Sequence, residues 1–202
     1  YLTDNPDVYE SKDVRIIIAP LVAPDGLFKK KILRTNGIVD VNRNFLTYDW
    51  YTDSVDLWRR RRGSRPRYFP GYFPNTEIET IFQTELIDKF KPNKILSVHA
   101  PLGFLDYDGP ADKVPVKLRQ KEKKSRHFVQ TIAKKSRNYR IVNYSFYPGS
   151  LGNYAGNERE IPTVTLELET ANPAHSTLYW EKFWPGFKQS IDYSFQKASS
   201  NN

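Results

Sequence analysis

The stretch IVDVNRNF, residues 38–45, places two amides and a fixed positive charge within three residues, directly after an apolar segment. Such a run is typical neither of a hydrophobic core nor of an ordinary turn. Arg43 can form bidentate hydrogen bonds with a carboxylate or an oxyanion, and so can Arg34, eight residues before Asn42. Taken alone, either arginine could be an ordinary surface residue. The stretch therefore indicates an anion site only if other functional residues converge on it.

The composition predicts a soluble globular protein. Its 202 residues suffice for a single domain, residues 1–202, with a substantial core. The absence of cysteine excludes disulfides and thiolate chemistry. No apolar run reaches the roughly 20 residues that span a bilayer, so no membrane span is expected. The formal net charge of +8 favours anionic partners, such as nucleic acid, acidic lipid or acidic cell-wall peptides.

Four apolar runs predict buried strands: residues 14–22, 94–100, 139–146 and 162–169. The first run is followed by Pro24-Asp25-Gly26, which predicts a turn. The runs are hydrophobic on both faces, as strands covered by helices are.

Helical spacing predicts three helices between and after these strands. The first opens with a Thr76-x-x-Glu79 capping box and ends before Pro92. The second, residues 117–137, is rich in lysine, and the third runs from about 176 to 198 with an interruption at Pro185-Gly186. Alternating strands and helices predict an α/β fold, a three-layer α/β/α domain around a central mixed, mostly parallel sheet.

Residues 46–75 differ from the rest of the chain. They contain WRRRRGSRPRYFPGYFPN, which is dense in arginine, aromatic residues and proline. We expect a long ordered loop over the sheet edge, of the kind that is often functional. The arginines and rings could pair phosphates and stack bases, so a nucleic-acid-binding module is a rival interpretation, although no nucleic-acid partner is expected.

Two residues stand where α/β proteins place their sites. His99 lies at the end of the strand ILSVHA, whereas His127 and His175 are expected at the surface and in a loop or cap. Glu167 lies within TVTLELE, where a buried carboxylate would have a raised pKa suited to general-base chemistry. Simple alternation, with Glu167 on a solvated face, is the other reading.

Five segments together resemble the zinc carboxypeptidases of the carboxypeptidase A type. They are APDG (23–26), LRTNGIVDVNRNF (33–45), SVHAPLGFLDYDGP (97–110), YPGSLGNYAG (147–156) and IPTVTLELE (161–169). Their order and spacing match the family across nearly the whole chain. The segment around His99 is most similar to bacterial murein tripeptide amidases and D,L-carboxypeptidases. The resemblance implies a metallopeptidase that trims cell-wall peptides in the bacterial periplasm or cell envelope, and we expect it to be a monomer.

The resemblance also implies residue roles. Asn42 and Arg43 would bind the terminal carboxylate of the peptide, and Arg34 would stabilise the oxyanion. His99 would be the last of three ligands to one zinc ion, and Glu167 the general base. The expected substrate-binding set also contains Ser150 and two tyrosines, Tyr144 and Tyr147, between which the sequence does not choose.

The sequence departs from the family at the metal. The first two zinc ligands of the family form a His-x-x-Glu motif, which this sequence lacks. Because the matched region begins at Tyr1, we expect those ligands, and the N-terminal part of the domain, to lie upstream of it or on a separate chain. The alternative is a metal-free, non-catalytic peptidoglycan-binding protein.

Overall fold

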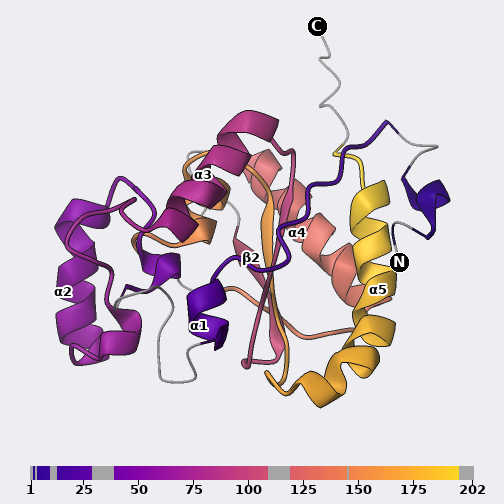
Figure 1. The fold of residues 1–202 in the computed structure, drawn as a ribbon. Coiled ribbons are helices and arrows are strands. Elements are labelled where there is room, and N and C mark those ends of the chain that lie inside the picture. Colours follow the sequence, from indigo (N-terminus) through magenta and orange to yellow (C-terminus); the bar gives the residue numbers. More distant parts are fainter. Residues whose placement is uncertain are drawn as a thin grey trace, which may run out of the picture.

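A four-stranded sheet in the order β1-β4-β2-β3 forms the centre of the molecule (Figure 1). The computed structural model describes residues 2, 4–9, 13–28, 39–108, 119–144 and 146–195. The strands are β1 (Ile95–His99), β2 (Phe104–Asp108), β3 (Ile141–Val142) and β4 (Thr163–Glu167). β4 pairs in parallel with β1 and antiparallel with β2, which pairs in parallel with β3. The mixed sheet of the predicted α/β class is thus confirmed.

Helices lie on both sides of this sheet (Figure 1). The α-helices are α1 (Pro24–Phe28), α2 (Trp50–Arg62), α3 (Ile78–Phe90), α4 (Arg119–Lys135) and α5 (Ser176–Asp192). Short 3-10 helices are η1 (Pro6–Val8), η2 (Val41–Arg43), η3 (Pro66–Tyr68) and η6 (Pro173–His175), and a π-helix, η5, covers Gly152–Asn157. α4 and α5 pack together on one face, and η5 contacts β2 and β4. None of the described helices is both long and apolar enough to cross a membrane.

The two faces of the sheet differ in polarity because side chains alternate along a strand. Leu105, Val164 and Leu166 are fully buried on the α4–α5 side, where they pack with Phe128 and Phe183. The opposite face carries hydroxyl, imidazole and carboxyl groups: Ser97, His99, Asp106, Asp108, Thr165 and Glu167. The apolar face holds the core, so the polar face is available for a site.

The predicted helices form, with one difference in continuity. In α4, the four apolar residues singled out by spacing, Phe128, Val129, Ile132 and Ala133, are all buried. α5 runs unbroken through Pro185, whereas the sequence predicted an interruption there. Phe183 and Gly186 are buried on either side of that proline. Packing against α4 therefore outweighs the hydrogen bond that proline removes.

Residues 14–22 do not form the predicted buried strand. Residues 14–19 are extended but pair with no described strand, and Ile18 is 63% exposed. An apolar run favours burial, but a strand also needs a hydrogen-bonding neighbour, and Pro20 removes one donor. Pro24-Asp25-Gly26, predicted as a turn, forms the start of α1.

Residues 46–75 are not one long loop. They contain α2 and the short helix η3. Residues 50–62 hold neither glycine nor proline, and Gly63 ends the helix in the left-handed conformation. The four arginines, Arg59–Arg62, occupy the last turn, where positive charge is favoured by the helix dipole.

The strand predicted over 139–146 is reduced to Ile141–Val142, and β2 was not predicted. The acidic residues Asp106 and Asp108 interrupt the apolar run that marked the other predicted strands. In the structure both acids point to the polar face while Leu105 and Tyr107 are buried in the core.

Asn44 of the opening stretch organises the layer above the polar face. It is fully buried, and its amide nitrogen donates to the carbonyl oxygens of Pro70 and Phe73, each at 2.9 Å. Its amide oxygen accepts from the backbone N–H groups of Thr76 and Glu77. These last two bonds hold the two residues that precede α3. The predicted Thr76–Glu79 capping box is wrong, because α3 begins at Ile78 with no side-chain cap and the hydroxyl of Thr76 binds Glu77 instead.

We expect Asn44→Asp to lower the free energy of unfolding by about 3 kcal/mol or more, measured by urea denaturation. The substitution replaces the Asn44 NH2 group, which donates to two carbonyl oxygens, with a carboxylate oxygen that cannot donate and is repelled by both. Asn172→Asp is the matched control, because Asn172 is exposed and only accepts a hydrogen bond at the start of η6. Equal effects of the two substitutions would contradict the role of Asn44.

Candidate functional site

His99 and Glu167 lie side by side at the carboxyl ends of two parallel strands. They are register partners in the β1–β4 pair, as are Ser97 and Thr165 two residues earlier. Residues in register on adjacent strands are about 5 Å apart and point to the same face. His99 Nε2 lies 3.0 Å from Ser97 Oγ. The two residues that the sequence singled out from segments far apart therefore meet on the polar face.

The first residue of β2 flanks Glu167 on its other side. Phe104 is the register partner of Glu167 in the antiparallel β2–β4 pair. Glu167 thus stands between His99 and an aromatic ring, and its Oε2 atom is shielded from solvent. The environment of Glu167 is not the fully solvated face that simple alternation would give.

A second carboxyl group is enclosed further down the same face. Asp108 Oδ2 accepts a hydrogen bond from the Thr165 hydroxyl at 2.7 Å. Burial, with the nearby charges of Asp106 and Glu167, raises the pKa of Asp108 to about 7. Gly152 of η5 allows this packing, because a Cβ there would lie 2.3 Å from Asp108 Oδ1. The polar face therefore holds three carboxyl groups close enough to affect one another.

Asn42 connects the opening stretch to the segment before η5. The Asp40 carboxylate accepts a hydrogen bond from the Asn42 backbone, which caps η2. The Asn42 side-chain oxygen accepts from the N–H of Leu151 at 2.8 Å. Its amide NH2 group donates to no described residue, so it is available to a ligand.

Arg43 lies on Tyr147. The guanidinium carbon is 4.3 Å from the ring centre, within the range of a cation–π contact. The Arg43 carbonyl accepts a hydrogen bond from Trp50 Nε1, the first residue of α2. The stretch 42–43 therefore lies between α2 and the 147–151 segment.

The two candidate tyrosines occupy different places. Tyr144 is 41% exposed, and its ring stacks on Phe104 at 6.0 Å. Tyr147 lies beside it at 6.2 Å and contacts Arg43. Ser150 is buried, and its hydroxyl accepts from the Asn153 N–H, which is the contact of a helix cap rather than of a ligand. The substrate roles of these residues stay predictions.

Arg34 lies outside the described residues, so its expected role at the oxyanion also stays a prediction. Three residues that the structure places near the others were not predicted from the sequence: Arg62, Phe104 and Asp108. The period-two pattern of FLDYD would have indicated the last two. Arg62 could not be distinguished from its three arginine neighbours by sequence.

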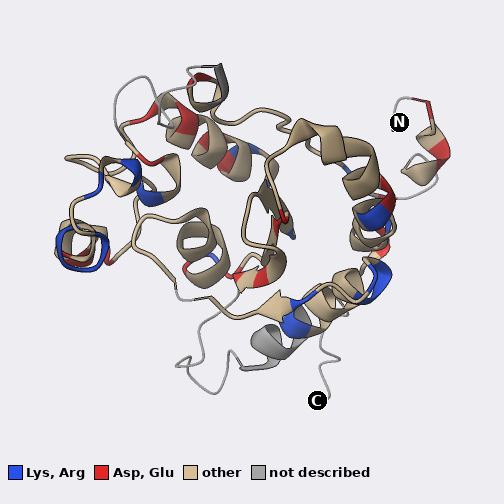
Figure 2. Cartoon of the chain, turned by 90° about the horizontal axis from the view of Figure 1, so that it is seen from below, with Lys and Arg blue, Asp and Glu red and all other residues tan. Residues whose placement is uncertain are grey.

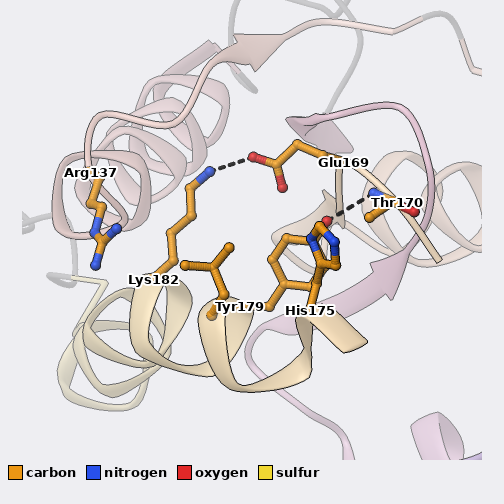
Figure 3. Close-up of a pocket in the computed structure, with 7 residues that line it drawn as sticks. Arg137, Glu169, Thr170, His175, Tyr179 and Lys182 are labelled. Carbon is orange, nitrogen blue, oxygen red and sulfur yellow. Dashed lines mark hydrogen bonds and ion pairs between the residues drawn. The ribbon is translucent and has the colours of Figure 1, made fainter. Parts of the chain in front are cut away.

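A polar pocket lies between the residues that follow β4, Glu169 and Thr170, and the start of α5 (Figure 3). Its volume is about 330 Å3, and it is lined by Arg137, Glu169, Thr170, His175, Leu178, Tyr179 and Lys182. Lys182 forms an ion pair with Glu169, and the Thr170 N–H donates to the Tyr179 hydroxyl. Tyr139 donates to the Glu167 carbonyl at 2.9 Å. None of the residues predicted for the site lines this pocket.

The described residues do not make a zinc site. They contain no group of three or more His, Asp or Glu side chains that could hold a metal ion. The chain has three histidines, and the two besides His99 are exposed on α4 and at the start of α5. His99 is therefore the single expected ligand that the described part of the chain supplies.

The raised pKa of Asp108 predicts a stability that depends on pH. The folded protein keeps a proton there that the unfolded chain releases above its ordinary pKa of 3.8. The stabilising contribution is complete below about pH 4 and is lost as the pH rises to about 7, at about 1.4 kcal/mol per pH unit. In urea unfolding, Asp108→Asn should flatten this decline, and the exposed control Asp53→Asn should not. An unchanged decline in Asp108→Asn would contradict the assignment.

Comparison with known proteins supports the fold. No protein-family model and no curated protein sequence matches the chain. Among solved structures, the murein-tripeptide amidase MpaA from Escherichia coli O157 is 19% identical with a TM-score of 0.56, over 87% of this chain and 67% of that one. Carboxypeptidase A from Helicoverpa armigera is 20% identical with a TM-score of 0.54, over 76% of this chain and 41% of that one. The chain therefore shares the fold of an amidase and a carboxypeptidase, both hydrolases.

Proposed function

We propose that this chain is a peptide hydrolase of the carboxypeptidase type that acts on acidic peptides, with cell-wall murein peptides as the substrate class. The observation that carries the proposal is the pairing of His99 and Glu167 at the carboxyl ends of adjacent strands. Ligand sites in α/β sheets lie at this edge. The murein-tripeptide amidase that shares the fold supports the choice of substrate. A bacterial periplasm or cell envelope is the compartment that such a substrate implies.

Glu167 is the general base of the proposed reaction. Its carboxylate takes a proton from a water molecule that attacks the scissile carbonyl carbon. The carbon–oxygen bond forms, the carbon–nitrogen bond breaks, and the same carboxyl group returns the proton to the leaving amine. The Tyr139 hydroxyl and the Lys182–Glu169 ion pair hold the strand end on which Glu167 stands.

Arg43 and Asn42 bind the terminal carboxylate of the peptide. A guanidinium fork and an amide NH2 group read a planar carboxylate better than a lysine would. The contact with Tyr147 restricts the rotamers of Arg43 before the substrate arrives. Arg34 is proposed to stabilise the oxyanion. Since the described residues do not form a three-ligand site, no step of the proposal passes through the zinc ion that the resemblance implies.

We expect Glu167→Gln to lower hydrolysis of a murein tripeptide by at least about a hundredfold, because the amide cannot accept the proton. Peptide affinity, measured by calorimetry, should change little. Glu181→Gln is the control, since Glu181 is exposed on α5. Retained turnover in Glu167→Gln would exclude the general-base role. Binding without turnover by the unmodified protein would favour the non-catalytic peptidoglycan-binding alternative.

Zinc binding by this 202-residue chain is expected to be weak. One imidazole does not hold catalytic zinc, which takes three protein ligands. After dialysis against zinc-free buffer, metal analysis should find well under one zinc per chain, and His99→Ala should remove what remains. One tightly held zinc per chain would show that residues outside the described part complete the site.

A further inference from the structure

Aromatic rings connect the strand end to the arginines of α2. The Phe104 ring, next to Glu167, stacks on Tyr144, and Tyr144 lies 6.2 Å from Tyr147. Arg62 of α2 is placed over the far end of this row, 4.9 Å from the Tyr147 ring centre and 4.8 Å from that of Tyr68. A row of ring contacts thus leads from the proposed general base to one arginine of the Arg59–Arg62 run.

Tyr147 holds two guanidinium groups close together. Arg43 and Arg62 lie 4.3 and 4.9 Å from the same ring centre, so their guanidinium carbons are at most about 9 Å apart. The Arg62 side chain also donates to the Tyr147 hydroxyl. Arg62 forms no ion pair with any residue in the described part of the chain. An anionic group placed between two guanidinium groups at this distance would be attracted by both.

Arg62 differs from the other arginines of its run. It is half-buried, whereas Arg59, Arg60 and Arg61 are exposed. Arg60 pairs with Asp56 at 3.0 Å. Figure 2 shows this positive charge gathered on α2, at the left of the view. Both arginines and Tyr147 line one small cavity of about 20 Å3, together with Trp58 and Tyr68. Of the four, only Arg62 is oriented by rings toward the proposed carboxylate site.

We propose that Arg62 is a specificity-determining residue that binds a second carboxylate on the terminal residue of the peptide. The inference rests on the proposed function, in which Arg43 binds the terminal carboxylate itself. The two carboxyl carbons of a terminal Glu are four bonds apart, roughly 4–5 Å, so both carboxylates can lie between two cations held within about 9 Å of each other. The preferred substrate is therefore a peptide that ends in a dicarboxylic residue. A peptide that ends in the corresponding amide lacks the group that Arg62 binds.

The test compares two peptides that differ only in ending with Glu or with Gln. Binding is measured by calorimetry in the Glu167→Gln background, so that the peptides stay intact. Arg62→Gln should weaken binding of the Glu-ended peptide roughly tenfold or more and that of the Gln-ended peptide less than about twofold. Arg61→Gln is the matched control, because it removes the same charge from an exposed position of the same helix.

Arg62→Lys separates geometry from charge. It keeps the cation but loses the planar fork, so it should give an intermediate loss for the Glu-ended peptide alone. Equal weakening of both peptides by Arg62→Gln, equal effects of Arg61→Gln and Arg62→Gln, or no preference in the starting protein would overturn the inference. Hydrolysis that depends on Glu167, with an unchanged preference in Arg62→Gln, would overturn this inference and leave the proposed function in place. A preference for the Glu-ended peptide that depends on Arg62, in a protein that hydrolyses no peptide, would support this inference and overturn the proposed hydrolase function.

Discussion

The hydrogen bonds of the Asn44 side-chain amide hold together the segments that carry the proposed site. A single buried amide satisfies two carbonyl oxygens of the 70–73 segment and two N–H groups at the start of α3. Few side chains can donate and accept at the same point in this way. Because Asn44 follows Arg43 directly, fixing the amide also fixes the backbone that carries the proposed carboxylate ligands. The same bonds therefore hold the backbone of the proposed site and the residues that lead into α3.

Close packing of η5 on β2 is the second constraint. Gly156 lies so near Asp108 that a Cβ there would be 1.8 Å from the Asp108 carbonyl oxygen, and Gly152 lies against the Asp108 carboxyl group. The absence of these side chains lets η5 cover the polar face and exclude water from Asp108. The raised pKa of Asp108 therefore results from the packing of η5 on β2, and this packing requires the glycines of GNYAGN. The same packing places Leu151 against Asn42.

The sequence predicted the parts of the fold in which local pattern and final environment agree. The runs around His99 and Glu167 are strands, and the apolar stripe of α4 is buried as its spacing indicated. The prediction of a strand over residues 14–22 was wrong, because an apolar run alone does not supply a neighbouring strand. Strand β2 was not predicted, because its two acidic residues lie on the polar face of the sheet. Family resemblance placed His99 and Glu167 together. Arg62 could not be found, because four consecutive arginines are equivalent until Tyr147 contacts one of them.

Contacts in the site join segments that are far apart in the chain. The hydrogen bond from Leu151 to Asn42 spans 109 residues, and those from Gly149 to Thr47 and from Asn153 to Asp49 span more than 100. The paired strands β1 and β4 are separated in the chain by β2, α4, β3 and η5. Closing such long loops costs entropy before any contact compensates for it, and folds rich in distant contacts fold slowly. The proposed ligand-binding surface therefore forms only in the completely folded chain, and partly folded states, even those with native helices, lack it.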